Sequence, residues 1–272
     1  MKKVILITGA SSGIGKATAI RLINEGYIVY ATARRMDKLK ELADRGARVL
    51  QLDVNDHEAV QHTVSVIVKE QGRIDVLFNN AGYGIIGAVE DVDITEAREQ
   101  FETNVFGVAA LTKAVLPVMR QQQSGKIINT SSMSGKVYAP LSSWYHASKH
   151  ALEGWSDCLR LEVKPFGIDV VIIEPGMIAT EFGDVSIPHM KQLAAAGPYS
   201  SMYKALLTAV EKSIQKAQSS SPDVIADVVS KAIKADKPAI RYVAGNFAKP
   251  ALFIRRWFGD RIYDKIVMSQ LK

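Results

Sequence analysis

The chain has 272 residues, of which 47% are hydrophobic and 23% charged, with a formal net charge of +6 at pH 7. This composition argues against a disordered chain, and the length fits one domain over residues 1–272 better than two independent units. The basic residues are scattered except for a denser stretch after Lys249, so we expect no nucleic-acid partner. Cys158 is the only cysteine, which excludes an intrachain disulfide and a multi-cysteine metal site. We therefore expect no metal and a reducing, cytoplasmic location.

The first two thirds of the chain alternate between short apolar runs and helical patterns. The N-terminus superficially resembles a signal peptide, but its apolar run stops at Thr8, so Val4–Ile7 is predicted to be a strand. A glycine-rich turn and a helix from Ile14 to Glu25 follow. Further strands are predicted at 28–33, 48–52, 74–79, 126–130, 168–173 and 239–243. This order predicts an α/β, doubly wound fold with a mostly parallel sheet covered on both faces. No apolar run reaches the roughly 20 residues that cross a bilayer.

The pattern weakens after Pro175–Gly176. Four helix-breaking residues interrupt the next stretch, and we interpret residues 177–220 as a substrate-covering loop region, broken at Gly183, Pro188, Gly197 and Pro198. Helical patterns resume around 202–216 and 222–235. We expect residues 245–272 to form a C-terminal helical extension. It is aromatic and basic, and it could cover a pocket or touch a membrane surface.

The first predicted turn has the context of a dinucleotide site. It directly follows a strand and opens a helix, so its backbone amides can face a pyrophosphate group. The candidate ligands are Gly9, Ser11, Ser12, Gly13, Ile14 and Gly15. The spacing differs from the usual GxGxxG, and glycines that serve only a tight turn are the alternative.

The end of the second strand indicates which dinucleotide binds. NAD-binding chains usually carry an acidic residue there, whereas this chain has Arg34 and Arg35. A guanidinium group can hold a 2′-phosphate, so NADP(H) is favoured over NAD, unless both arginines are merely surface residues. Asp37 is a nearby acidic rival, although it more simply begins the helix that follows.

The ends of the third and fourth strands supply further candidates. Asp53, followed by Val54, could accept a hydrogen bond from the adenine amino group, and helix capping is an equal contender for Asp53. The fourth strand runs into Asn80, Ala81 and Gly82, where small and amide side chains suit close approach of a cofactor; a plain turn is the alternative.

Tyr145 and Lys149 lie four residues apart in a helical pattern, so they share one face. An ammonium group near a phenol favours the ionised phenol, which makes the pair suitable for acid–base chemistry at neutral pH. A surface pair is the alternative. His146 points to another face, and we expect it to serve surface or interface packing.

Seven motifs in register resemble the short-chain dehydrogenase/reductase family, and the tract Gly26 to Arg34 with the extended C-terminus looks similar to its hydroxysteroid and retinol dehydrogenase branch. The seven motifs span about two thirds of the chain and consist of Thr8-Gly9-xxx-Gly13-Ile14-Gly15, Asp53, Asn79-Asn80-Ala81-Gly82, Asn104, Ser132, Tyr145-xxx-Lys149 and Pro175-Gly176-xxx-Thr180. The resemblance implies a seven-stranded Rossmann fold. One departure is Ser12, because NADP-preferring members often carry a basic residue at this position.

The resemblance also implies a catalytic tetrad. Tyr145 would exchange a proton with the carbonyl or alcohol oxygen, Ser132 would hydrogen-bond that oxygen, and Lys149 would hold the nicotinamide ribose and lower the pKa of Tyr145. Asn104, which helix propensity alone disfavours in mid-helix, would anchor a water next to Lys149. Ser131 and Ser134 stay possible in place of Ser132. Pro175, Gly176 and Thr180 would contact the nicotinamide.

Apolar residues around the expected pocket indicate a hydrophobic ketone, aldehyde or alcohol substrate; they are Tyr83, Val137, Tyr138, Leu141 and Met177. Long helices near 95–121 and 143–164 predict a homodimer or homotetramer, because the family pairs such helices. The rival functions are a catalytically silent NADP-binding regulator and a membrane-surface binding module that uses the C-terminal tail.

Overall fold

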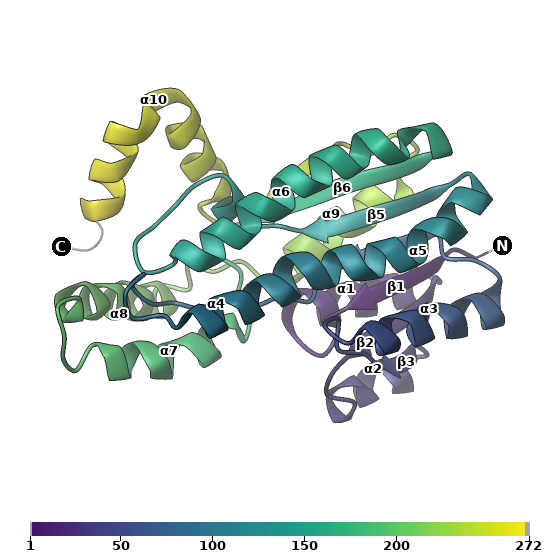
Figure 1. Cartoon of the computed structure of the whole chain (residues 1–272), viewed down its shortest axis with the longest axis horizontal. Helices are drawn as coiled ribbons and strands as arrows, with labels where there is room; N and C mark the ends of the chain where they lie inside the picture. The colour runs from purple at the N-terminus through teal and green to yellow at the C-terminus, as the bar shows by residue number, and fades with distance from the viewer. Residues whose placement is uncertain (1, 270–272) are drawn as a thin grey trace.

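Seven strands form one parallel sheet in the order β3-β2-β1-β4-β5-β6-β7, which confirms the predicted doubly wound fold (Figure 1). The computed structural model describes residues 2–269. The strands are β1 Val4–Thr8, β2 Ile28–Ala33, β3 Arg48–Gln51, β4 Val76–Asn79, β5 Gly125–Thr130, β6 Ile168–Pro175 and β7 Arg241–Ala244. Every residue of β1 is buried, as its branched apolar sequence predicts for a central strand covered on both faces.

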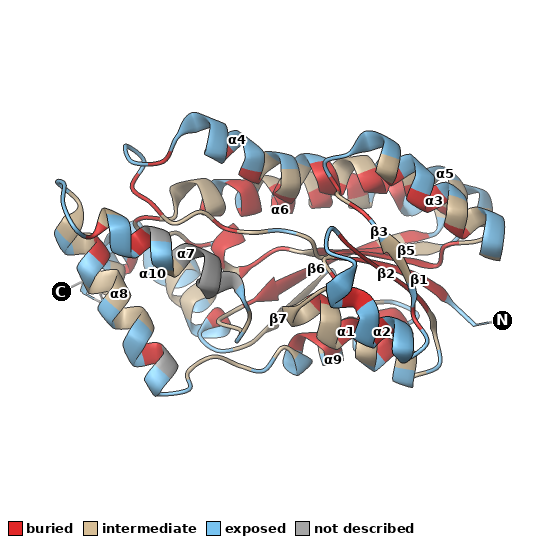
Figure 2. Ribbon diagram, turned by 90° about the horizontal axis from the view of Figure 1, so that it is seen from below, coloured by how far each residue is buried: buried red, intermediate tan, exposed pale blue. Residues whose placement is uncertain are grey.

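Helices cover both faces of this sheet (Figure 2). One layer contains α1 (Gly13–Asn24), α2 (Lys40–Asp44) and α9 (Asp223–Lys234); the other contains α3 (His57–Gln71), α5 (Val108–Gln122) and α6 (Ser143–Val163). Each helix layer packs against the sheet through its own hydrophobic cluster. Leu22 and Val229 belong to the first cluster, and Val64 and Leu111 belong to the second. The short helix α4 (Ile94–Phe101) continues through a π-helical segment, Glu102–Gly107, into α5. Shorter 3-10 helices lie at Asp37–Leu39, Met133–Gly135 and Lys164–Phe166.

The region after β6 is more regular than the sequence indicates. It contains α7 (Phe182–Leu193) and α8 (Ser200–Gln215), so the predicted break at Pro188 is wrong. Proline removes one helical hydrogen bond, but Met190 and Ala194 are buried against Tyr203 and Leu141, and this packing holds the helical backbone.

The C-terminal extension is helical, as predicted. It forms α10 (Ala248–Ser269), which kinks at Gly259, where φ is 71° and ψ is −179°. Residues 270–272 of the predicted extension lie outside the described residues. Within residues 2–269, none of the helices combines the length and apolarity that would carry it through a bilayer.

The chain reverses direction across the sheet between β1 and β4, the neighbours from which the two halves wind outward. The loops that follow β1, β4, β5 and β6 all leave the sheet at its carboxyl edge, because these strands are parallel. Ligands of open α/β sheets bind outside this edge at such a reversal. The predicted site residues therefore gather at one place.

Candidate active site

The loop between β1 and α1 is a backbone cradle that excludes side chains. A Cβ atom at Gly15 would lie 2.2 Å from the Gly9 carbonyl oxygen, and one at Gly9 would lie 2.9 Å from the Ala81 Cα. Gly9 and Gly13 also have φ values of 64° and 51°, which favour glycine. Ser12 precedes α1 without making a side-chain capping bond to the helix. The first amides of α1 therefore lack a capping side chain and suit an anionic group such as a pyrophosphate.

Residues after β4 hold this cradle in place. The side chain of Asn80 donates to the carbonyl oxygens of Thr8 (3.2 Å) and Gly9 (3.3 Å). The Thr8 hydroxyl in turn accepts from the backbone amides of Asn80 and Ala81, at 3.0 Å each. Thr8 was not among the predicted site residues, although its position between strand and glycine turn is the signal for this role.

The loop after β6 closes over the same place. A Cβ atom at Gly13 would lie 3.0 Å from the Cγ2 of Thr180, so this threonine faces the glycine cradle. The Gly176 amide donates to the Ala244 carbonyl oxygen at 2.8 Å, and a Cβ atom at Gly176 would lie 2.1 Å from the Asn246 carbonyl oxygen. The structure thus brings Thr180 to the predicted dinucleotide loop, whereas the contacts of Gly176 are with the segment after β7.

The two arginines after β2 have different surroundings. Both are exposed, and Arg35 lies 3.6 Å from the carboxylate of Glu181, a pair that solvent screens. Arg34 forms no ion pair with any described carboxylate, and its charge reaches Tyr83 beside the cradle. Arg34 is therefore the more available of the two for an anionic ligand.

Asp53 does not cap a helix. Its carboxylate accepts a hydrogen bond from the Asn55 amide at 3.0 Å, while α3 is capped by Asp56, whose carboxylate accepts from the Ala59 amide. The capping alternative for Asp53 is therefore wrong. Asp53 is half-buried and Val54 is buried, at the carboxyl end of β3.

Tyr145 and Lys149 share a face of α6 at the edge of the cradle, as the four-residue spacing predicts. The Lys149 Nζ lies 5.9 Å from the centre of the Tyr145 ring and donates to the Thr130 carbonyl oxygen at 2.8 Å. Ser132 hydrogen-bonds to the Tyr145 side chain, and it is the member of the serine group that reaches this phenol. The Ser132 hydroxyl also accepts from the Ser134 amide at 3.1 Å, which orients it.

The environment changes the acidity of both groups. Burial raises the pKa of Tyr145, and the hydrogen bond from Ser132 acts in the opposite direction. Burial also lowers the pKa of Lys149 from 10.5 to about 8, although the carboxylate of Glu153 opposes this shift. The predicted lowering of the Tyr145 pKa is thus not found, because the loss of solvent on burial outweighs the hydrogen bond from Ser132. At neutral pH the phenol is protonated.

Asn104 lies in the π-helical segment and is fully buried. Its amide nitrogen donates to the Tyr83 carbonyl oxygen (2.8 Å) and to the Ser148 hydroxyl (3.1 Å), and its Oδ1 accepts from the Tyr83 amide (3.1 Å). A Cβ atom at Gly82 would lie 2.9 Å from this Oδ1 and 3.7 Å from the Lys149 Nζ. The side chain therefore ties the loop after β4 to α6, and Oδ1 retains one lone pair on the side facing Lys149.

His146 is a correction to the sequence prediction. It is 8% exposed, and its Nδ1 lies 3.0 Å from the Ser134 carbonyl oxygen and 2.7 Å from that of Val137. Its contacts are therefore inside the chain, where it fixes the loop between Ser132 and Tyr145. Burial lowers its pKa, so it remains a neutral donor. Periodicity showed which face of α6 it occupies but could not show that this loop folds over that face.

The expected substrate region contains a cluster of packed apolar side chains. Leu141 is buried against Met190 and Tyr203, whose hydroxyl accepts from the Ala88 amide and donates to Asp91, both at 2.7 Å. Tyr138, in the loop after Ser132, contacts α10 through its hydroxyl and its ring. Among the described residues, no group of three or more histidine, cysteine or acidic side chains could hold a metal ion.

Comparison with known proteins identifies the family. A family model described as "short chain dehydrogenase" matches residues 3–190. An uncharacterized oxidoreductase of Bacillus subtilis is 37% identical over 280 aligned positions, which cover 99% of each chain. A 3-ketodihydrosphingosine reductase of Bacteroides thetaiotaomicron is 49% identical over 182 residues, which cover 67% of this chain and 66% of that one. The second relative agrees with the predicted hydroxysteroid and retinol dehydrogenase branch.

Solved structures share the whole fold. A short-chain dehydrogenase from Streptomyces avermitilis has a TM-score of 0.81 at 33% identity, covering 98% of this chain and 95% of that chain. An actinorhodin polyketide ketoreductase solved with NADPH has a TM-score of 0.76 at 29% identity, covering 89% of this chain and 95% of that chain. The chain therefore belongs to the short-chain dehydrogenase/reductase family of oxidoreductases, as its motifs predicted.

Proposed function

We propose that this chain is an NADP(H)-dependent oxidoreductase that interconverts a hydrophobic ketone or aldehyde and its alcohol, working as a single catalytic domain in the cytoplasm. The observation that carries the proposal is the Tyr145 phenol, hydrogen-bonded to Ser132 and one helical turn from Lys149, at the rim of the glycine cradle. When bound there, the nicotinamide supplies or accepts the hydride.

Tyr145 acts as the acid in the reducing direction. Its raised pKa keeps the phenol protonated at neutral pH, so it can donate a proton to the carbonyl oxygen as hydride reaches the carbon. In the oxidising direction the phenol must first lose its proton, which a raised pKa disfavours. The phenol is therefore already in the protonated form that reduction requires at neutral pH. Ser132 donates a hydrogen bond to the same oxygen as negative charge develops on it.

Lys149 and Asn104 support this proton transfer. The ammonium group of Lys149 favours the ionised phenol left after donation, and it is held by the Thr130 carbonyl oxygen. Asn104 positions Lys149 through Ser148 and the loop after β4, and its free lone pair can hold a water on the way to solvent. We assign it a positioning role in addition to the predicted water-binding role.

Backbone and side chains around the cradle would hold the cofactor. The pyrophosphate would be bound by Gly9, Ser11, Ser12, Gly13, Ile14 and Gly15, and the adenine by Asp53 and Val54. The adjacent ribose would contact Asn80, Ala81 and Gly82. The carboxamide side of the nicotinamide would contact Pro175, Gly176 and Thr180. The preference for NADP(H) rests on Arg34, which has no described ion-pair partner, and on the lack of an acidic residue at the end of β2. Arg35 would assist from its position next to Glu181.

A hydrophobic substrate is supported by the apolar lining near Leu141 and Tyr203. The name of the Bacteroides thetaiotaomicron relative also denotes reduction of a keto compound, which accords with a ketone substrate. We infer a ketone or aldehyde on an apolar skeleton.

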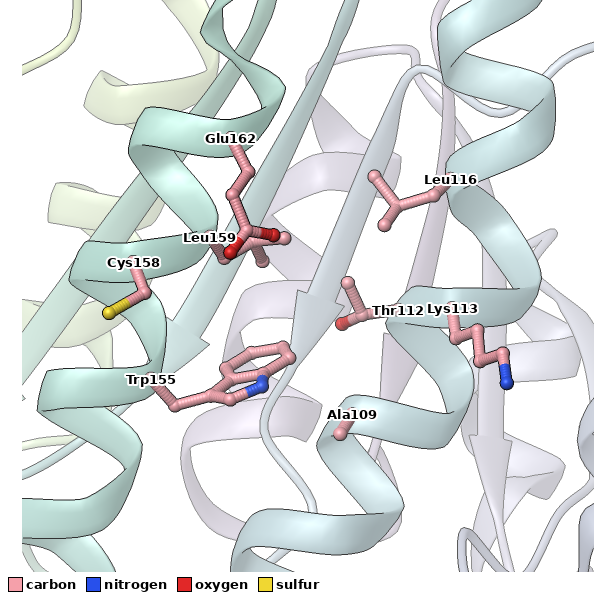
Figure 3. A pocket seen from close by; sticks show the side chains of 8 residues that line it. All are labelled: Ala109, Thr112, Lys113, Leu116, Trp155, Cys158, Leu159 and Glu162. Atoms are coloured by element: carbon pink, nitrogen blue, oxygen red, sulfur yellow. The ribbon is translucent and has the colours of Figure 1, made fainter.

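We further propose that the protein is a homodimer or homotetramer that pairs through α5 and α6. Figure 3 shows a hollow between these helices into which Leu116 and Trp155 project, with Cys158 at its edge. Leu161 of α6 is 62% exposed, and contact with a second copy would remove this apolar surface from water. Replacing Cys158 with glutamate would place a charge in this surface and should give monomers by light scattering; an unchanged mass would reject this interface.

The enzymatic proposal is tested by following NADPH and NADH oxidation with a panel of hydrophobic ketones and aldehydes. Tyr145→Phe should lower kcat by about 100-fold or more, since a positioned general acid contributes this much. Tyr27→Phe is the matched control, because this tyrosine packs against α1 and its hydrophobic cluster at the opposite end of β2. Unchanged turnover in Tyr145→Phe would reject the mechanism, and NADPH binding without turnover on any substrate would indicate the silent regulator instead.

The cofactor choice has its own test. Arg34→Ala should raise the KM for NADPH by roughly 10- to 100-fold, the cost of one charge-assisted hydrogen bond, and leave that for NADH unchanged. Equal effects on both cofactors would reject a role in 2′-phosphate binding.

A further inference from the structure

The C-terminal helix α10 stands out from the sheet as two arms that meet at a bend (Figure 1). The kink at Gly259 separates the arm Ala248–Phe258 from the arm Asp260–Ser269. The two faces of α10 differ in their contacts: one packs against the rest of the protein and the other is exposed.

One face anchors α10 to the rim of the active site. Tyr263 is 6% exposed and its ring meets that of Tyr138 at 5.1 Å, while the Tyr138 hydroxyl donates to Asp264 at 2.7 Å. The guanidinium of Arg255 lies over the Tyr138 ring at 5.3 Å and pairs with Asp260 at 2.6 Å. Tyr138 belongs to the loop between Ser132 and Tyr145, so α10 is held against the segment that joins two of the proposed catalytic residues.

The other face exposes aromatic rings. Phe253 contacts Trp257 and Phe258, with ring centres 6.3 and 6.2 Å apart, and the three side chains are 57%, 67% and 51% exposed. Ile262, beyond the kink, is 44% exposed. We call these four residues the tail patch. Six of the thirteen exposed large hydrophobic residues lie between 247 and 268, so apolar exposure on this chain is concentrated here rather than scattered.

Exposed cations lie on the same helix as the tail patch, whereas the carboxylates of α10 already have hydrogen-bond partners. Arg256 lies over the Trp257 ring at 5.8 Å, and Lys249, Arg256 and Arg261 are exposed. None of these three cations has a carboxylate within ion-pair distance among the side chains that the structure describes. The two acidic residues of α10, Asp260 and Asp264, both hydrogen-bond to Tyr138 on the anchored face.

This combination fits the surface of an anionic bilayer. Tryptophan and phenylalanine rings sit at the boundary between headgroups and acyl chains, and arginines beside them bind anionic headgroups. A second copy of the chain fits less well, because a symmetric contact through this face would bring the same unpaired cations together.

We propose that the tail patch docks the protein on anionic lipid bilayers and thereby holds the loop of Tyr138, which α10 covers, close to the membrane that supplies a hydrophobic substrate. The docking stands on the residues of α10 alone; the delivery of substrate rests on the proposed oxidoreductase function.

Sedimentation with vesicles tests the docking. The full chain should bind vesicles of phosphatidylcholine containing about one third phosphatidylglycerol and should bind pure phosphatidylcholine much less. Phe253→Ser/Trp257→Ser should abolish binding, and Arg256→Gln/Arg261→Gln should weaken it by roughly fivefold per arginine removed. Val224→Ser/Ile240→Ser, which removes exposed apolar groups outside α10, should bind as the wild type does. Brominated lipid should quench wild-type tryptophan fluorescence but not that of Trp257→Phe.

Each outcome decides the proposal. Absence of binding to anionic vesicles, or equal binding by Phe253→Ser/Trp257→Ser, would overturn it. A change in the mass of that variant by light scattering, with vesicle binding intact, would assign the patch to a second copy instead. Turnover of a small water-soluble carbonyl should persist in the patch variants, which separates failure of docking from failure of the catalytic proposal.

Discussion

Replacing Glu174 with glutamine should stabilise the protein above pH 7 and leave it nearly unchanged at pH 5. Glu174 and Glu153 are each 2% exposed and lie within hydrogen-bonding reach of each other. Neither Glu153 Oε1 nor Glu174 Oε1 receives a hydrogen bond from another described group, so one proton between the two carboxyl groups would satisfy both.

The cations around this pair favour Glu153. Its Oε2 accepts from Arg241 Nε (3.1 Å) and Nη2 (3.0 Å) and lies 3.0 Å from Lys136 Nζ, whereas Glu174 has only Arg241 Nε at 3.2 Å. Arg241 also pairs with Asp157 at 2.7 Å, and this pairing weakens the electrostatic stabilisation that Arg241 gives to the Glu174 carboxylate. Burial, assisted by the adjacent Glu153 carboxylate, therefore raises the pKa of Glu174 from 4.5 to about 7.

The sign of the effect follows from proton binding. Between pH 4.5 and about 7 the folded state binds this proton more tightly than the unfolded state does, so stability falls as pH rises through this window and then stays low. A pKa difference of this size corresponds to about 3 kcal/mol, which is roughly 6–12 °C in the unfolding midpoint. Glutamine cannot ionise, so the variant should escape this loss.

The assay is thermal unfolding of wild type and Glu174→Gln at pH 5, 6, 7 and 8, at one scan rate. The midpoint difference should widen with pH in favour of the variant. Glu211→Gln, which changes an exposed carboxylate on α8, should run parallel to the wild type. Parallel curves for Glu174→Gln, or a variant that loses stability at pH 8, would show that Glu174 is ionised and needed by Arg241.

Three further predictions concern the site itself. Gly15→Ala should abolish NADPH binding by calorimetry, because its Cβ would lie 2.2 Å from the Gly9 carbonyl oxygen, whereas Gly154→Ala, with no atom within 4 Å, should bind normally. The kcat/KM for carbonyl reduction should fall above about pH 8 as Lys149 loses its proton, and a profile that stays flat to pH 9.5 would refute this role. His146→Ala should lower the free energy of unfolding by about 1–3 kcal/mol, since it leaves the Ser134 and Val137 carbonyl groups without their donor; intact stability in urea unfolding would contradict this.

The strands and the catalytic spacing were predictable from local sequence. A strand covered on both faces is mostly apolar, which is why β1 and the middle of β6 stand out as runs of branched residues. A four-residue spacing within one helix places Tyr145 and Lys149 on one face whatever surrounds them. Glycines followed by a helix are likewise a local signal, and the cradle lies where that signal puts it.

What depends on distant segments was decided only by the tertiary structure. Three features depend on which distant chain segments pack over them. They are the continuation of α7 through Pro188, the burial of His146 and the direction of the pKa shift of Tyr145. The same holds for Glu153, Glu174 and Arg241, which come from α6, β6 and β7 and meet only because these elements pack together. Burial and electrostatic contact are properties of neighbours in space, and sequence periodicity records only neighbours along one helix or strand.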